Sequence, residues 1–321
     1  MRRHNKKILI TGGAGYIGLN LIIFFLNEEY QITVIDNLST SKPINKEIKK
    51  YINFFKIDLT NKNQVKKFFK QKNFDVIIHL AAYSGVEEFN KNVSKSFNNN
   101  VIATKNLLTY GFSKKSTKLI FASSAAVYGK VSNNKISEKN ICNPVNYYGL
   151  SKYACENIIY DHFQNKNTQY AILRYFNVVG SILTFKIFKN TKNLLDIISD
   201  NIKNKKYKIN VNGNKHNTKD GTPERDFIHI NDLCKIHKKT FLYLNNTKKN
   251  IVLNCGSGTK YSVLKIIREF EKELQRKFKL SFKIKNLNET ETICSDMSRL
   301  KTLLKIDIKK KGIYNCIKDY L

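Results

Sequence analysis

The most informative features of this 321-residue sequence are ones it lacks, beginning with any long apolar run. A membrane helix needs about 20 consecutive apolar residues, whereas the longest candidate, residues 19–26, is interrupted by Asn20. The basic start, residues 1–7, has the charge of a signal peptide. The apolar stretch after it runs directly into glycines, which predicts a strand instead. We therefore expect a cytoplasmic protein without a membrane partner.

Acidic residues are also scarce: 25 Asp and Glu stand against 57 Lys and Arg, a formal net charge of +32. Such an excess points first to nucleic-acid binding. The lysines are spread along the whole chain, however, and the densest clusters, residues 203–208 and 309–311, contain a single aromatic, Tyr207. Dispersed charge of this kind is typical of a solvated surface. We expect no nucleic-acid partner, although a basic surface would still attract an anionic substrate.

Cysteine pairs are missing as well. The six cysteines contain no C-x-x-C spacing, and only three prolines punctuate the chain. Cys234 and His237 form one C-x-x-H pair, but no second pair accompanies it and a zinc site usually needs four ligands. The sequence therefore supports neither a disulfide framework nor a metal site, and isolated buried thiols are expected.

What is present is an alternation of strand and helix signals. Short β-rich apolar runs lie at residues 8–11, 32–36, 54–58, 76–80, 119–123 and 170–174, with helical spacing between them. This alternation predicts an α/β fold with a doubly wound parallel sheet of the Rossmann type. After Gly180 the segments become irregular, which favours a smaller C-terminal α/β substrate lobe. We expect one domain over residues 1–180 and a lobe over 181–321, with the strand near 252–254 and the helix from 262 to about 274 returning to the first domain.

Three glycines spaced three apart, Gly12, Gly15 and Gly18, follow the first strand in the stretch KILITGGAGYIG. Gly12 would allow a tight turn, Gly15 would let the backbone approach a pyrophosphate, and Gly18 would let the next helix pack closely. The N-terminus of that helix would then attract the phosphates. The second strand ends at Asp36, where a carboxylate would bind an adenosine ribose 2′-hydroxyl and repel a 2′-phosphate. With Asp58 placed to reach the adenine, the pattern predicts NAD as the cofactor.

A second motif carries the chemistry. Tyr148 and Lys152 lie four apart on a predicted helix over about 147–163, and therefore on one helix face. Lys152 is predicted to lower the pKa of Tyr148 from its usual value of about 10, so that the phenolate can act as a general base on a sugar hydroxyl. Ser124 leaves the end of the fifth strand, where ligands of such sheets bind, and would contact the same hydroxyl. The expected catalytic residues are Tyr148, Lys152 and Ser124.

Together these motifs resemble the extended short-chain dehydrogenase/reductase family, and within it the UDP-glucose 4-epimerase (UDP-galactose 4-epimerase) branch. The likeness extends from Lys7 to about Lys265 and is carried by the stretches TGGAGYIG, VIDNLSTS, DVIIHLAA, SSAAVYG, YYGLSK, LRYFNVVG, KDGTPERDFIHIND and NCGSGTKYSVL. It implies a tightly held NAD, a UDP-sugar substrate, commonly a homodimer, and interconversion of UDP-glucose and UDP-galactose through a 4-keto sugar.

The resemblance also assigns residues to each ligand. Around NAD it implies Gly12, Gly15, Tyr16, Ile17, Gly18, Asp36, Asn37, Leu38, Ser39, Thr40, Ser41, Asp58, Leu59, Leu80, Ala81, Ala82, Tyr83, Ser84, Asn99, Ser124, Tyr148, Lys152, Tyr175 and Phe176. Around the UDP-sugar it implies Ser124, Tyr148, Asn177, Asn193, Leu194, Arg225 and Ile293. The planar fork of an arginine suits a phosphate, and Ile293 is expected to line the 2-substituent of the sugar.

Some positions depart from the family pattern. Asn212 stands where an aromatic residue usually lies near the uracil. Asn286 and Glu289 stand where an R-x-x-D pattern usually helps to hold the diphosphate, and Lys285 beside them could substitute as a point charge. These departures put the affinity for the UDP-sugar in question more than the chemistry.

Related and unrelated functions can be weighed against the same residues. Dehydratases of this family need an acid beside the serine, and Ala125 and Ala126 cannot transfer protons, which argues against a dehydratase. A UDP-N-acetylglucosamine or UDP-glucuronate 4-epimerase stays open as an alternative. A non-catalytic NAD- or RNA-binding protein predicts the loss of Tyr148 or Lys152, and both are present.

Overall fold

A computed structural model describes residues 6–84, 86–112, 117–131, 135–182, 194–283, 290–308 and 312–321. Its main body is a seven-stranded sheet in which every neighbouring pair of strands is parallel. The order β10-β6-β5-β4-β1-β2-β3 confirms the expected doubly wound sheet. The strands are β1 (Lys7–Thr11), β2 (Gln31–Asp36), β3 (Asn53–Lys56), β4 (Val76–His79), β5 (Lys118–Ser124), β6 (Tyr170–Tyr175) and β10 (Ile251–Cys255).

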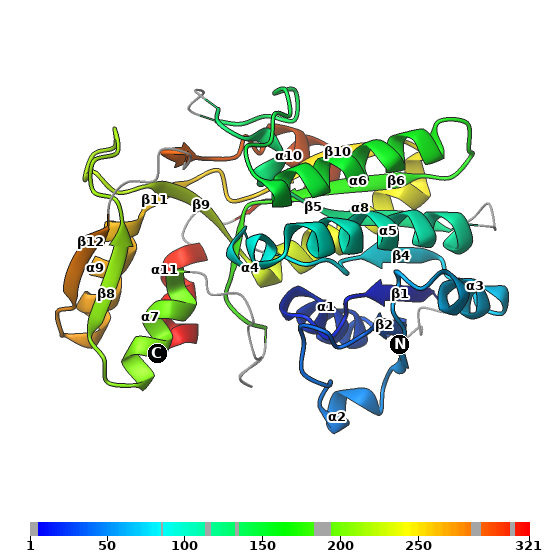
Figure 1. The fold of residues 1–321 in the computed structure, drawn as a ribbon, viewed down its shortest axis with the longest axis horizontal. Coiled ribbons are helices and arrows are strands. Elements are labelled where there is room, and N and C mark those ends of the chain that lie inside the picture. Colours follow the sequence, from blue (N-terminus) through cyan, green and yellow to red (C-terminus); the bar gives the residue numbers. More distant parts are fainter. Residues whose placement is uncertain are drawn as a thin grey trace.

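Helices cover both faces of this sheet (Figure 1). Successive residues of a strand therefore enter different cores: Ile8 and Ile10 of β1 face one side, whereas Leu9 faces the other. Burial on both faces explains why these strands read as unbroken apolar runs. One core is formed with α1 (Tyr16–Asn27), α8 (Ile230–Thr247) and α10 (Ser298–Leu304), and the other with α3 (Lys62–Lys70), α5 (Val93–Gly111) and α6 (Tyr147–Phe163).

The chain builds outward from β1 in both directions, so that β1 and β4 lie side by side with their carboxyl ends at one edge of the sheet. In parallel α/β sheets ligands bind at such a point. The third strand is shorter than predicted, because it ends at Lys56. Beyond it, the carboxylate of Asp58 accepts hydrogen bonds from the N–H and hydroxyl of Thr60, at 2.8 and 2.7 Å, which turns the chain. Shorter elements in the connections are α2 (Lys46–Lys49), α4 (Val86–Lys91) and the 3-10 helix η1 (Ala125–Tyr128).

A smaller lobe lies to one side of the main sheet (Figure 1). In it β9 (Glu224–His229) pairs with β7 (Asn177–Val179), β11 (Lys260–Ser262) and β13 (Thr292–Ile293). A second pair joins β8 (Lys208–Asn212) to β12 (Lys279–Lys283). Packed on these strands are α7 (Leu194–Lys203), α9 (Val263–Leu274), α11 (Gly312–Ile317) and the 3-10 helix η2 (Lys318–Tyr320).

The chain crosses between the two parts more than once. After residue 180 it returns to the main body as α8, β10 and α10, and β10 pairs with β6 as an edge strand. The expectation that the helix from residue 262 also returns is wrong, because Ile266, Ile267 and Phe270 of α9 belong to the core of the lobe. Within the ranges described above, no helix is both long enough and apolar enough to cross a membrane.

Candidate active site

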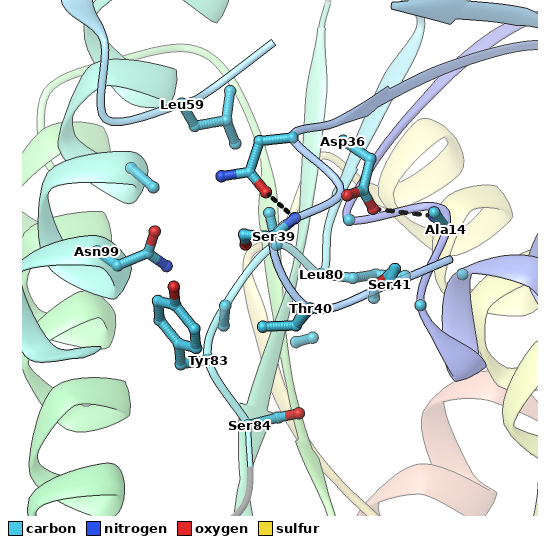
Figure 2. A pocket seen from close by; sticks show the side chains of 18 of the residues that line it. Ala14, Asp36, Ser39, Thr40, Ser41, Leu59, Leu80, Tyr83, Ser84 and Asn99 are labelled. Carbon is cyan, nitrogen blue, oxygen red and sulfur yellow. Dashed lines mark hydrogen bonds between the residues drawn. The ribbon is translucent and has the colours of Figure 1, made fainter. Parts of the chain in front are cut away.

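A pocket opens beyond the carboxyl ends of the central strands, where β1 and β4 meet. In Figure 2, Ala14 and Asp36 lie on one side of it and Tyr83 and Asn99 on the other. Leu38 is not among its lining residues. Of the side chains expected around NAD, those that line it are Gly12, Gly15, Tyr16, Ile17, Gly18, Asp36, Asn37, Ser39, Thr40, Ser41, Asp58, Leu59, Leu80, Ala81, Ala82, Tyr83, Ser84, Asn99, Tyr148, Lys152 and Tyr175.

The three glycines of the first loop have different surroundings. Gly12 has a φ of +69°, and a Cβ there would lie 2.6 Å from the backbone nitrogen of Ala81. A Cβ at Gly18 would lie 2.6 Å from the carbonyl oxygen of Gly12, so this glycine lets α1 approach the loop. At Gly15 the backbone is extended, and a Cβ would meet the Gly12 oxygen at 3.3 Å and Ser41 Oγ at 3.9 Å. A Cβ at Gly15 would make one close contact but no overlap with the protein, so there is more room there than at Gly12 or Gly18, and Gly15 lines the pocket.

The N-terminus of α1 faces this room without a side-chain cap. Gly15 precedes the helix and has no side chain to cap it, and the first turn has no acidic residue. Its N–H groups and the helix dipole therefore favour an anion. Asp36 Oδ2 accepts from the N–H of Ala14 at 3.0 Å (Figure 2), and Oδ1 accepts from the N–H of Leu38 at 2.8 Å. Burial raises the pKa of Asp36 and these bonds oppose the rise, while each oxygen keeps a lone pair for a ribose hydroxyl.

A second cleft adjoins the pocket, between the main body and the lobe. Tyr148 and Tyr175 line both. Ser124 and Phe176, expected beside NAD, line this cleft. Of the expected substrate contacts, those that line it are Ser124, Tyr148, Asn177, Arg225 and Ile293, together with the departing residue Asn212. Leu194 packs against the core of the lobe instead, and Asn193, Lys285, Asn286 and Glu289 lie outside the described residues.

Tyr148 is placed by the close approach of α6 to the segment after β5. Asn146 caps α6, its side chain accepting from the N–H of Gly149 at 2.8 Å. A Cβ at Gly149 would overlap the carbonyl oxygen of Ala126, so only glycine permits this contact. Tyr148 is thereby brought close to Ser124, and both line the same cleft. Sequence reasoning missed Asn146 and Gly149, although both flank the tyrosine motif.

The charges at this junction differ from the sequence prediction. Burial raises the pKa of Tyr148, and the neighbouring hydroxyl of Ser124 opposes that rise. Lys152 Nζ donates to the carbonyl oxygen of Ala122 at 2.8 Å, and burial lowers the pKa of Lys152 to about 8. The prediction that Lys152 brings the pKa of Tyr148 down toward neutrality is therefore wrong for the chain on its own.

On the lobe side, Arg225 is anchored at the cleft. Its Nη1 donates to the carbonyl oxygens of Glu224 and Glu291, at 3.0 and 3.2 Å. The neighbouring carboxylate of Asp226 is fully buried and accepts hydrogen bonds at 2.5–3.0 Å from Ser257, Gly258 and Ser295. Asp226 therefore ties β9, the loop after β10 and the segment after β13 together directly behind the cleft.

Several lining residues were given no role from the sequence, although some lie within the quoted motifs. Ile35 and Ile57 precede the two aspartates, and Ala122 and Ser123 precede Ser124. Their positions follow once the strand ends are known, because strands that end at one edge of a parallel sheet present consecutive residues there. The other unpredicted lining residues are Ala14 and Ala103 in the pocket and Asn90, Val93, Ala125, Ala126, Gly129, Pro144, Val145, Asn146, Tyr147, Leu150 and Thr290 in the cleft.

Comparison with known proteins decides the family. Residues 8–256 match the model of the NAD-dependent epimerase/dehydratase family. The chain belongs to this family. A relative in it, the UDP-glucose 4-epimerase of Bacillus subtilis, is 33% identical over 317 residues, which is 94% of this chain and 92% of that protein. The chain spans only 41% of another relative, the bifunctional protein gal10 of Schizosaccharomyces pombe, with 35% identity over 292 residues.

Solved epimerase structures share the whole fold. The UDP-glucose 4-epimerase of Bifidobacterium longum, in complex with NAD⁺ and UDP, has a TM-score of 0.88 at 27% identity, covering 98% of this chain and 97% of that one. The UDP-Glc/GlcNAc 4-epimerase of Campylobacter jejuni has a TM-score of 0.84 at 32% identity, covering 98% of both chains. The expected family resemblance is thus confirmed over nearly the full length of this epimerase-family chain.

Proposed function

We propose that this member of the epimerase family interconverts UDP-glucose and UDP-galactose by inverting C4 of the hexose, with NAD regenerated in every cycle. The observation that carries this proposal is the position of the Tyr148 phenol, which lines both the pocket and the adjoining cleft. Tyr148 lies beside Ser124, and Lys152 follows it by one helical turn. A group at that junction can contact a cofactor on one side and a sugar on the other.

The pocket fits NAD in three respects. The room at Gly15 and the uncapped start of α1 suit a pyrophosphate. The Asp36 carboxylate suits an unmodified ribose and would repel the 2′-phosphate of NADP. When bound, NAD would supply a hydride acceptor that later acts as the donor, so that the reaction has no net redox change.

The chain's own residues move the proton and hold the substrate. Tyr148 would take the proton of the 4-hydroxyl and return it after the oxidised sugar has turned over. Ser124 would orient the same oxygen, and Lys152 would stabilise the phenolate by its charge. Arg225, anchored at the cleft, would bind the diphosphate, and Asn177, whose Nδ2 donates to the carbonyl oxygen of Asp226 at 3.1 Å, would bind beside it.

A direct assay tests this function. The purified protein is denatured and the supernatant is analysed for NAD, and the intact protein is incubated with UDP-galactose or UDP-glucose. We expect NAD to be released on denaturation and each sugar to be converted into the other without added cofactor. A requirement for stoichiometric NAD, with accumulation of NADH, would show that the chain is a dehydrogenase instead.

A second candidate substrate is the N-acetylated pair of UDP-hexosamines. Ile293 of β13 lines the cleft and is partly buried. Ile293 is expected to line the 2-substituent of the sugar, where an isoleucine leaves more space for an N-acetyl group than a bulkier residue such as tyrosine would. Changes of methylene size in a pocket shift the discrimination between substrates by only about 1–3 kcal/mol. UDP-glucose and UDP-galactose remain the main substrates of this proposal, with weak turnover of the N-acetylated forms.

Two further expectations from the sequence remain predictions. A homodimer is expected from the family resemblance, and size-exclusion chromatography with light scattering would measure the oligomeric state directly. A cytoplasmic location is expected from the sequence, and fractionation of cells that produce the protein would test it.

A further inference from the structure

The helix that carries Tyr148 contacts β5 at three of its residues. Lys152 and Glu156 of α6 hydrogen-bond with Ala122 and Ser123 of β5, and Tyr148, on the same face of α6, lies close to Ser124. In the second of these pairs, Ser123 Oγ donates to Glu156 Oε1 at 2.5 Å. Glu156 therefore shares one stripe of α6 with the two expected catalytic residues, although it lines neither the pocket nor the cleft.

Glu156 is fully buried and pairs with Arg174 of β6, which is 4% exposed. The guanidinium binds both carboxylate oxygens, with Nη2–Oε2 at 2.6 Å and Nε–Oε1 at 3.0 Å. Arg174 Nη1 also donates to the hydroxyl of Tyr128 at 3.0 Å, and that hydroxyl donates to Asn254 Oδ1 of β10 at 2.7 Å. The ion pair thus links α6 to the ends of β5, β6 and β10.

Stability alone does not account for this pair. Burying two charges costs so much desolvation that apolar side chains of similar volume often stabilise a protein equally well or better. The pair does affect two parts of the site. The hydrogen bond from Ser123 to Glu156 holds the strand end that leads into Ser124, and the charge of Glu156 lies one helical turn from Lys152.

The charge matters because Lys152 is buried. Burial lowers the pKa of Lys152 to about 8, and Cys155 and Glu156 act against this lowering. Without the carboxylate, the guanidinium of Arg174 would act on Lys152 as an uncompensated like charge. Without the guanidinium, the negative charge of the carboxylate would be uncompensated and would favour the protonated form of Lys152.

The histidine, tyrosines and cysteines around this cluster do not gain or lose a proton near neutral pH. Burial lowers the pKa of His79, on β4, to about 3. Burial raises the pKa values of Tyr128 on η1, of Tyr148, Cys155 and Tyr160 on α6, and of Cys142 ahead of α6. Glu138 accepts from the N–H of Asn254 at 2.7 Å, at the far end of the network.

We propose that Glu156 and Arg174 are positioning residues for the epimerase reaction: Glu156 holds Lys152 as an ammonium ion and fixes the strand end that carries Ser124, and Arg174 balances its charge. This inference rests on the proposed function, because Lys152 and Ser124 act in that reaction. It assigns no substrate contact to either residue of the pair.

The test compares the pH dependence of kcat for wild type, Glu156→Gln and Arg174→Gln, normalised to bound NAD. Loss of the carboxylate lets Lys152 give up its proton at lower pH, so the alkaline limb of the Glu156→Gln profile moves toward neutrality. Loss of the guanidinium moves the limb of Arg174→Gln to higher pH or leaves it in place. KM for the UDP-sugar stays close to wild type in both, since neither residue lines the cleft.

A matched control is Glu28→Gln, which removes one partner of the Glu28–Lys238 ion pair, at 2.6 Å and about one-third exposed. Its profile should superimpose on wild type. The proposal is overturned if the Glu156→Gln limb does not move, or if both site variants shift in the same direction, because a merely structural pair would lower stability without shifting the limbs.

A double variant covers the case in which the single variants do not fold. Glu156→Leu/Arg174→Met replaces the pair by apolar side chains and should fold and retain NAD. We expect its kcat to fall by about tenfold or more, because a displacement of the reacting groups by about 1 Å can lower the rate by about 10²-fold. A kcat equal to that of wild type would refute the positioning role.

A readout without turnover separates this inference from the proposed function. The folded pKa of Lys152, about 8, lies below its unfolded value. The cost of burying Lys152 is therefore complete below that pH and is relieved as the pH rises toward the unfolded value. In Glu156→Gln, the relief should begin at lower pH in urea unfolding curves, with Lys152→Met as the reference. If this shift is found in a protein that does not epimerise, the Glu156–Lys152 coupling is supported and the proposed function is rejected. If the protein epimerises but shows no shift, the function is supported and the coupling is rejected.

Discussion

The pair of substitutions Gly15→Ala and Gly12→Ala tests the cofactor pocket. At Gly15 the new methyl group would meet protein atoms at 3.3 Å or more, with a backbone conformation open to any residue. We expect the free energy of unfolding of the NAD-free protein to change by less than about 1 kcal/mol. The methyl group would occupy ligand space, and overpacking costs about 1–3 kcal/mol. That range corresponds to an NAD affinity about 5- to 150-fold weaker.

Gly12→Ala should instead lower mainly the free energy of unfolding. Its φ of +69° and a Cβ 2.6 Å from the Ala81 nitrogen place strain in the protein itself. The left-handed conformation alone costs about 1–2 kcal/mol, so we expect a loss of more than about 2 kcal/mol in unfolding free energy once the contact is added. Urea unfolding of protein stripped of NAD and calorimetric titration with NAD measure the two quantities. If Gly15→Ala bound NAD like wild type, or lost as much stability as Gly12→Ala, the room at Gly15 would not be ligand space.

Three other substitutions address the remaining assignments. Tyr148→Phe removes one hydroxyl and should keep the fold and NAD while lowering kcat by about 10²–10⁴-fold, and an active variant would exclude Tyr148 as the base. Asp36→Asn should shift the ratio of NAD to NADP affinity toward NADP, because it removes the charge that repels a 2′-phosphate; an unchanged ratio in binding titrations would place the ribose elsewhere. Ile293→Tyr should lower kcat/KM for the N-acetylated sugars relative to the plain sugars, by about 1–3 kcal/mol of discrimination, and an unchanged ratio would mean that Ile293 does not line the 2-substituent.

Local patterns were sufficient to predict much of the main body. Strand–helix alternation identified β1, β2, β4, β5 and β6, and the glycine spacing located the loop that carries Gly12 and Gly15. These features are set by residues close together in the sequence; the φ that the turn requires at Gly12 is an example. The lobe was less accessible, because its sheet joins β7, β9, β11 and β13 from distant parts of the chain.

The errors arose where a tertiary environment decides the outcome. The spacing of Tyr148 and Lys152 predicted their proximity on α6, but burial and the hydrogen bond from Lys152 to Ala122 set the charges there. The sequence predicted the helix that is α9 but assigned it to the first domain, because a helical pattern does not show which core the helix will join. Asp226 lies within the quoted stretch KDGTPERDFIHIND, but nothing in that stretch shows that its side chain is buried, and only the fold brings Ser257, Gly258 and Ser295 to its oxygens.

The late return of the chain as α8 and β10 has a consequence for biosynthesis. A ribosome releases the first 180 residues before β10, the strand that pairs with β6, or α8, one of the helices that cover this face of the sheet, has been made. The nascent segment would then present an unpaired edge and apolar side chains that α8 later covers, which are the features that promote aggregation. The sheet is complete only after residue 255 has emerged, so we expect the nascent chain to be prone to aggregation until translation has passed that point.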